Sequence, residues 1–290
     1  MELQTFQREA AKTDQAAGES EKSILIPLLG LAGEVGTLLS EYKKFLRDGH
    51  AHLRFKEQVA EDLGDLLWYV ANAATKFGFD LEEIARANIE KTRSRWPTSD
   101  KAGQYKLFDD RFPLNEQFPR KFRVSFSEAP EGDAVRVVIA KDGEIVGDPL
   151  TDNAREDDGY RFHDVFHLSY VAVLGWSPII RKLFGVKRKS DSETDEVEDG
   201  ARARIIEEMI SQLVYTYARE HNYLEGVPGV DYHLLKTIQA LVADREVKIR
   251  SLADWEKAIL DGYEVWRAVR SNGGGTVEVD LLERRIALAT

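Results

Sequence analysis

The sequence lacks several features that mark secreted or membrane proteins. Its 290 residues include no cysteine, which excludes disulfide bonds and thiolate metal sites and is typical of a reducing compartment. The first residues, MELQTFQREAAKTDQ, contain no apolar run of the signal-peptide type. We also find no run of roughly 20 consecutive apolar residues, the length that spans a bilayer. We therefore expect a cytoplasmic protein without a membrane partner.

Positive charge is also scarce. The chain has 40 lysines and arginines against 51 aspartates and glutamates, so its formal net charge is -11 at pH 7. This balance disfavours broad, nonspecific binding to nucleic acid, although it is compatible with a local basic patch. The remaining composition is ordinary for a globular protein, and the length is enough for one large core or two smaller ones.

Helical periodicity dominates the first third of the chain. Apolar residues recur with the period of a helix in four segments, 2–17, 24–47, 54–77 and 80–95. The second segment is entered through Pro27 and ends at Asp48-Gly49, and Pro97 follows the fourth. These segments predict an all-α helical bundle over residues 1–97.

The pattern changes after Pro97. Residues 98–119 hold two prolines and a glycine with little periodicity, which predicts a linker. Residues 120–150 alternate between apolar and polar, with Phe122, Val124 and Phe126 on one face, which predicts a β-hairpin or meander. Helical patterns return in a C-terminal domain, 151–290, which also contains a charged segment at 187–200 that we expect to be a solvated loop. The predicted fold is therefore mainly α with a small β region.

The C-terminal helices show a short similarity to the N-terminal ones. Residues 61–69, EDLGDLLWY, can be aligned with residues 207–215, EEMISQLVY. Each segment follows an apolar helix that carries acids or histidines. The alignment predicts that the C-terminal domain is a degenerate repeat of the N-terminal bundle.

Four acidic residues interrupt the apolar faces of two predicted helices. Glu34 and Glu41 are two helical turns apart on the first, and Asp62 and Asp65 are three residues apart on the second. Buried carboxylates need a counter-charge, and oxygen ligands without cysteine or histidine suit Mg²⁺ or Mn²⁺. The alternative is that these acids lie on solvated faces of amphipathic helices.

The same stretches resemble a known family. GLAGEVGTLLSEYKKFLRDG and AEDLGDLLWYVANAATKFGFDLEEIARANIEKTRSRW are similar to the MazG-type nucleotide pyrophosphohydrolases, of the all-α NTP pyrophosphatase superfamily, over about residues 1–97. The resemblance implies hydrolysis of a nucleoside triphosphate to the monophosphate and pyrophosphate with Mg²⁺. It carries the catalytic acids onto Glu34, Glu61, Asp62 and Asp65. Since modules of this family usually pair, it also implies a homo-oligomer.

The resemblance extends to residues that would contact the substrate, with one departure. Asn88, Lys91 and Arg95 match a family segment whose side chains meet the phosphates, and their spacing places them on one helical face. Thr37 stands where the family has a second glutamate, so a charged metal ligand is missing unless Glu41 replaces it.

Two other residues near the acids are candidates for substrate contacts. Trp68 could stack on a base, although a core aromatic is the alternative. Lys43 could attract phosphates, although a basic residue near a helix end is also favoured by the helix dipole.

A second group of metal-binding side chains lies in the C-terminal domain. His163 and His167 are one helical turn apart with Asp164 between them, and Glu207 and Glu208 fall on a later helix. Three interpretations remain open for this group. It could be a buried polar network, a second metal or nucleotide site, or the completion of the first site within a pseudo-dimer.

The sequence thus predicts a Mg²⁺-dependent nucleoside triphosphate pyrophosphohydrolase with an added domain. Two rival functions are compatible with it. One is a nucleotide-binding sensor or scaffold in which catalysis was lost with the glutamate at position 37. The other is a phosphohydrolase that uses a transition metal at the C-terminal histidines.

Overall fold

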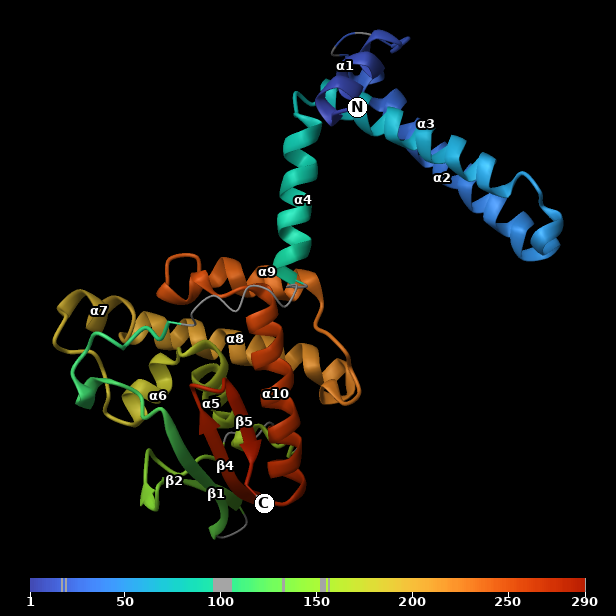
Figure 1. Cartoon of the computed structure of the whole chain (residues 1–290). Helices are drawn as coiled ribbons and strands as arrows, with labels where there is room; N and C mark the ends of the chain where they lie inside the picture. The colour runs from blue at the N-terminus through green and yellow to red at the C-terminus, as the bar shows by residue number, and fades with distance from the viewer. Residues whose placement is uncertain are drawn as a thin grey trace. The chain divides into compact units, whose positions relative to one another are not determined.

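The computed structural model shows a mainly helical protein with a small antiparallel sheet, as predicted (Figure 1). It describes residues 1–16, 18, 20–95, 106–131, 134–151, 155 and 157–289, and the side chains at 94, 95, 131 and 134 are outside this description. The chain forms two compact units, Met1–Arg93 and Ser94–Thr290. The predicted boundary at residue 97 lies outside the described residues.

The first unit consists of four helices, close to the four that the sequence predicts: α1 (Leu3–Lys12), α2 (Glu21–Asp48), α3 (Phe55–Lys76) and α4 (Leu81–Arg95). Helices α2 and α3 pack along each other and are joined by a short 3-10 turn at Gly49–Ala51. Helix α2 begins earlier than predicted because the Ser20 hydroxyl accepts a hydrogen bond from the Ser23 backbone N–H, which caps the helix. Pro27 therefore lies inside the helix rather than at its start.

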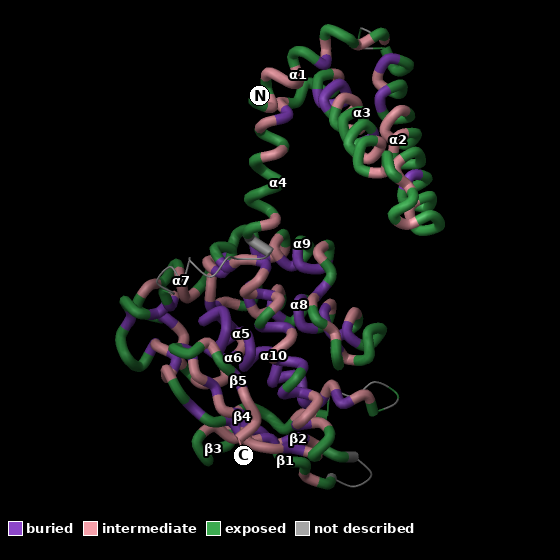
Figure 2. Tube along the Cα trace, turned by 45° about the vertical axis from the view of Figure 1, so that its right-hand side comes forward, coloured by how far each residue is buried: buried purple, intermediate pink, exposed green. Residues whose placement is uncertain are grey.

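Many residues of the α2–α3 pair are exposed (Figure 2), and several of these have large apolar side chains. The exposed side chains on these two helices are Leu25, Ile26, Leu28, Leu29, Val35, Leu39, Tyr42, Leu46, Leu63, Leu67 and Val70. The buried apolar core of this unit is small, with Ala10, Ala71, Ala74 and Leu81 at its centre. Exposed apolar side chains in this number are typical of a helix pair that binds a partner.

Helix α2 also differs from what the sequence led us to expect about membranes. Among the described residues, the stretch Glu21–Ala51 is long and apolar enough to cross a membrane, with a mean hydropathy of 1.6 in its most apolar window. This finding rests on length and composition only, and a helix that packs against a partner protein can have the same composition.

The second unit is built around helix α5 (Asp164–Leu174), in which every residue is buried. Helix α10 (Leu252–Ser271) packs along α5, and strands β4 (Gly274–Asp280) and β5 (Arg285–Leu288) contact both helices. The remaining helices are α6 (Pro178–Leu183), α7 (Ser192–Val197), α8 (Ala201–Glu220) and α9 (Tyr232–Leu241). Together they enclose one large apolar core.

The sheet combines strands that are far apart in the sequence. Strands β1 (Lys121–Glu131), β2 (Ala134–Lys141) and β3 (Glu144–Ile145) form the predicted meander, and the order in the sheet is β3-β2-β1-β4-β5. Phe122, Val124 and Phe126 all point into the core, as their alternation predicts. Strand β4 pairs with β1 beside Gly274, where a Cβ atom would stand 2.4 Å from the carbonyl oxygen of Phe126. Glycine is required there for the two backbones to approach.

The predicted linker is wrong over its second half. Leu107, Phe112 and Phe118 are buried in the second unit, and Asp109 is fully enclosed. The Asp109 carboxylate accepts hydrogen bonds from Arg181 at 2.9 Å, from Arg120 at 2.7 Å and from the Phe118 backbone N–H at 2.8 Å. This segment lacks periodicity because single side chains, rather than a helix face or a strand face, anchor it.

The prediction of a solvated loop at 187–200 is also wrong. Arg188 and Asp199 are each about 1% exposed or less and form a bidentate ion pair, and Arg188 also binds Glu246. The segment contains helix α7, which is capped by Asp191. The many charged residues of this segment predicted a solvated loop, but Arg188 and Asp199 form ion pairs in the interior instead.

The internal repeat is not reproduced in the packing. The alignment predicts that α5 and α8 pair as α2 and α3 do, whereas α5 packs chiefly along α10 and meets α8 over a small area. A short pattern of apolar and acidic positions is common to many amphipathic helices, so it does not fix the partner of a helix.

Candidate functional sites

The predicted acids of the first unit lie on the facing helices α2 and α3. Asp62 is buried, Glu34 is half-buried, and Asp65 and Glu61 are exposed. Among the described residues, however, these acids do not form a group of three whose carboxylate oxygens lie within 4.8 Å of one another. One copy of the chain therefore carries the acids on neighbouring helices without assembling them into a closed metal site.

Among these acids, Asp62 has the carboxylate whose surroundings best suit a bound cation. Its Oδ2 atom is buried and has no hydrogen-bond partner among the described residues. A buried carboxylate oxygen without a partner is costly, because the charge loses its hydration and gains nothing in return. An oxygen-binding divalent cation held with Glu34 and Asp65 would supply the missing counter-charge.

Glu41, the predicted substitute for the missing family glutamate, is paired with two basic side chains in this structure. Its Oε2 atom lies 2.9 Å from His52 Nε2, and its Oε1 atom pairs with Lys44. The hydrogen bond from Lys44, with a second from His52, holds the pKa of Glu41 below its ordinary value. Both carboxylate oxygens are thus engaged within the unit. Thr37 is exposed, and its hydroxyl donates to the Gly33 carbonyl oxygen of its own helix at 3.3 Å.

The structure places Trp68 in a packing role. Its ring lies against the small apolar cluster of the first unit, and its indole N–H donates to the Thr13 hydroxyl at 2.8 Å. Trp68 therefore links the end of α1 to α3, which agrees with the core alternative, while its stacking on a base stays a prediction. Lys43 is exposed on α2, two residues after Glu41.

The predicted phosphate-binding residues lie on α4. The start of this helix is held by the Gln7 side chain, which accepts a hydrogen bond from the Leu81 backbone N–H at 2.9 Å. Asn88 and Lys91 are exposed, and the side chain of Arg95 is outside the described residues. In Figures 1 and 2 helix α4 runs at an angle to the α2–α3 pair rather than along it.

The predicted C-terminal cluster is brought together by α5 and α8. His163, His167 and Glu208 each offer a ligand atom, and these atoms lie within 4.8 Å of one another. His167 is fully buried, and its Nε2 atom stands 3.6 Å from Glu208 Oε2, without a hydrogen-bond partner. Asp164 is buried beside them and lines the same pocket.

Glu207 holds His167 rather than joining the ligand set. The Nδ1–H of His167 donates to Glu207 Oε1 at 2.9 Å, and Glu207 also accepts from the Ser177 hydroxyl at 2.6 Å and the Ile179 backbone N–H at 2.9 Å. Burial by itself would lower the pKa of His167, but the charge and hydrogen bond of Glu207 outweigh it and raise this pKa to about 10.

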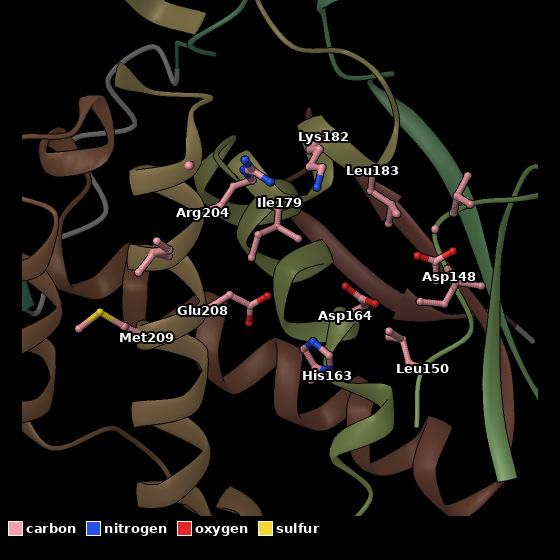
Figure 3. A pocket seen from close by; sticks show the side chains of 15 residues that line it. Asp148, Leu150, His163, Asp164, Ile179, Lys182, Leu183, Arg204, Glu208 and Met209 are labelled. Carbon is pink, nitrogen blue, oxygen red and sulfur yellow. The ribbon is translucent and has the colours of Figure 1, made fainter. Parts of the chain in front are cut away.

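A pocket of about 760 Å³ opens beside this cluster (Figure 3). His163, Asp164 and Glu208 face it, and Lys182 and Arg204 stand along the same space. The sequence reasoning missed these two cations. Arg204 lies one helical turn before Glu208 on α8, a spacing that was visible in the sequence, whereas nothing there connects Lys182 to the histidines.

Comparison with known proteins agrees with the two-unit organisation. The sequence model of the MazG nucleotide pyrophosphohydrolase domain matches residues 23–99, and that of the MazG C-terminal domain matches residues 103–290. The Gene 37 protein of Mycobacterium phage L5 is 35% identical over 69 residues, which are 23% of this chain and 60% of the phage protein. The chain thus matches less than two thirds of that relative. No solved structure matches the chain. Because the two family models together account for almost all of the described residues, the chain belongs to the MazG nucleotide pyrophosphohydrolase family and carries the MazG C-terminal domain.

Proposed function

We propose that the first unit hydrolyses a nucleoside triphosphate to the monophosphate and pyrophosphate in a Mg²⁺-dependent reaction. The observation that carries the proposal is the buried, unpartnered Oδ2 atom of Asp62, in a helix that the MazG domain model covers. Glu34, Asp62 and Asp65 form an all-oxygen donor set, which is the chemistry that Mg²⁺ prefers.

Each acidic and basic residue of the first unit would have its own role in this reaction. Glu34, Asp62 and Asp65 would hold the cation, which when bound supplies positive charge to the phosphates and lowers the pKa of a water molecule. Glu61 is exposed beside Asp62 and would accept a proton from the attacking water. Lys91 and Arg95 would neutralise the charge that develops on the phosphates.

We further propose that the site is completed by a second copy of the chain. Among the described residues the acids of one copy are not assembled, and the α2–α3 pair exposes many large apolar side chains. Exposed apolar side chains are stabilised when they pack against similar ones. Sedimentation of the active protein should give at least twice the chain mass, and an active monomer would contradict the proposal.

The direct test is a screen of canonical and modified nucleoside triphosphates with Mg²⁺. Chromatography of the products separates monophosphate plus pyrophosphate, the expected pair, from diphosphate plus phosphate. We expect Asp65→Asn to remove activity, while Glu57→Gln, which changes an exposed acid in the first turn of α3, should keep it. Failure to release pyrophosphate from any triphosphate would overturn the proposal.

A second candidate function is favoured by the state of Thr37 and Glu41. Thr37 bonds to its own helix and Glu41 is engaged by Lys44 and His52, so the carboxylate missing at position 37 has no substitute. The protein would then bind a nucleotide without turnover, as a sensor or scaffold.

The variant Thr37→Glu tests this alternative. If the missing carboxylate limits catalysis, the substitution should raise the rate of pyrophosphate release by at least tenfold, because it adds a charged ligand. Calorimetry should show that the unmodified chain binds the same nucleotide. An equal rate in both proteins would show that position 37 does not control turnover, and Thr37→Ser serves as the neutral control.

A further inference from the structure

The second unit brings together three side chains that could hold a metal ion and that have no role in the proposed function. Two ligands come from the start of α5, where His163 and His167 are one turn apart, and the third, Glu208, comes from α8. Zinc lies about 2.0–2.1 Å from nitrogen ligands, so donors on one tetrahedral ion stand about 3.4 Å apart. The 3.6 Å between His167 Nε2 and Glu208 Oε2 is close to this separation. Glu208 is half-exposed and free to adjust its rotamer, while His167 is fixed.

Both histidines are held in the way that metal ligands usually are. His163 Nδ1–H donates to the Tyr160 carbonyl oxygen at 3.0 Å, and His167 Nδ1–H donates to Glu207. Because both partners accept, the proton on Nδ1 is retained, and each ring would bind an ion through Nε2, which gives up its own proton when the metal binds. A carboxylate or carbonyl on the far nitrogen is the usual outer support of a metal-bound histidine. Glu207 is itself fixed by Ser177 and Ile179, so the orientation of His167 is set before any ion arrives.

The Nε2 atom of His167 is a buried polar atom that lacks a hydrogen-bond partner among the described residues. It is fully enclosed, and the Glu208 carboxylate, at 3.6 Å, stands beyond hydrogen-bond distance. A buried polar atom in this state costs free energy unless a ligand or an ion satisfies it.

The pocket beside the ligands is lined by two basic side chains, Arg204 and Lys182, and by the carboxylates of Asp148 and Asp164 on the side of the α5 ligands. Arg204 Nε is buried and has no hydrogen-bond partner among the described residues, which suits an anion. The N-terminal end of α8 reaches this pocket at Ala201, and its cap residue, Gly200, offers no side-chain hydrogen bond, so the helix dipole there favours a negative group. The wall also includes the apolar side chains of Ile179, Leu183 and Met209.

We propose that the second unit binds a divalent transition metal through His163, His167 and Glu208, and that the metal holds the phosphate group of a small molecule in the adjoining pocket. Two nitrogens and one carboxylate leave at least one coordination position for such a ligand. Lys182 and Arg204 neutralise the remaining phosphate charge, and the apolar wall receives the rest of the molecule. Glu207 is a positioning residue that acts through His167.

The metal is tested first, by equilibrium dialysis of the intact chain against Zn²⁺ followed by elemental analysis. The Asp62→Asn background weakens the proposed Mg²⁺ site of the first unit, so that the ion counted belongs to the second. We expect one ion per chain, lost in both Glu208→Gln and His163→Gln and kept in His233→Ala, which removes an exposed histidine outside the pocket. Unchanged metal content in the first two variants would overturn the proposal.

The phosphate is tested by calorimetry of the zinc-loaded protein with inorganic phosphate. We expect binding that is weakened at least tenfold in Lys182→Met and in Arg204→Met, with the metal content unchanged. Glu208→Gln keeps a half-exposed side chain of the same size, so it separates loss of the ligand from loss of the fold. A zinc-loaded protein that does not bind phosphate would overturn the role of the pocket. Metal content and phosphate binding are measured without pyrophosphate release, so a negative result here would not contradict the proposed activity, and the loss of that activity would not contradict this proposal.

Discussion

Replacing Asp62 by asparagine should lower kcat/KM for the triphosphate by about 10³-fold. A bound cation typically contributes several kcal/mol to phosphoryl chemistry, and each 1.36 kcal/mol corresponds to a tenfold change in rate. Asparagine keeps the shape of the side chain but loses the charge that Oδ2 would offer to the cation. Steady-state measurement of pyrophosphate release, with Glu57→Gln as the control, checks this expectation.

The same variant should separate metal binding from folding. Without Mg²⁺ the buried Oδ2 of Asp62 has no partner, so Asp62→Asn should be at least as stable as the unmodified protein. Mg²⁺ at 100 times its dissociation constant should stabilise the unmodified protein by about 2.7 kcal/mol and leave the variant unchanged. Thermal melts followed by circular dichroism give both values. Equal stabilisation of the two proteins by Mg²⁺ would place the ion elsewhere.

The largest effect on stability is expected from Arg188→Met in the second unit. Arg188 is almost fully buried, and its guanidinium group donates to Asp199 at 2.6 Å and to Glu246 at 2.6 and 2.9 Å. Removing one member of a buried ion pair leaves an uncompensated charge and typically costs about 3–5 kcal/mol. We expect the free energy of unfolding of this unit to fall by that amount.

Urea unfolding followed by tryptophan fluorescence measures this change, because Trp176, Trp255 and Trp266 lie in the core of the second unit. Lys189→Met is the matched control, since Lys189 is the next residue and is exposed. Its effect should stay within about 0.5 kcal/mol. A loss below 1 kcal/mol in Arg188→Met would show that the cluster around Asp199 reorganises when the arginine is removed.

The helices of the first unit could be predicted closely from the sequence. Their apolar period, the stop at Gly49 and the acidic first turn of α4 act within a few residues, so the sequence contains what is needed to locate them. The start of α2 was predicted late because Pro27 is a stronger signal in the sequence than the cap at Ser20. Capping depends on a single hydroxyl group, which is common in loops as well.

The interior ion pairs of the second unit could not be predicted. Arg188 and Asp199 lie in a stretch whose composition is typical of a solvated loop, and Asp109 lies in one that is typical of a linker. Their partners, Glu246 and Arg181, are 58 and 72 residues away. Charge content alone does not distinguish a solvated segment from one whose charges are paired inside the protein.

The sequence by itself determined the family, the helical character of both units and the identity of the candidate ligands, because these depend on local patterns and on side-chain chemistry. The tertiary structure alone decided which of those ligands meet. It left Asp62 with an unpartnered oxygen, engaged Glu41 with Lys44 and His52, and brought His163, His167 and Glu208 together beside Arg204 and Lys182. The physical reason is that a metal or anion site depends on distances of a few ångströms between separate helices, and packing across the whole core sets those distances.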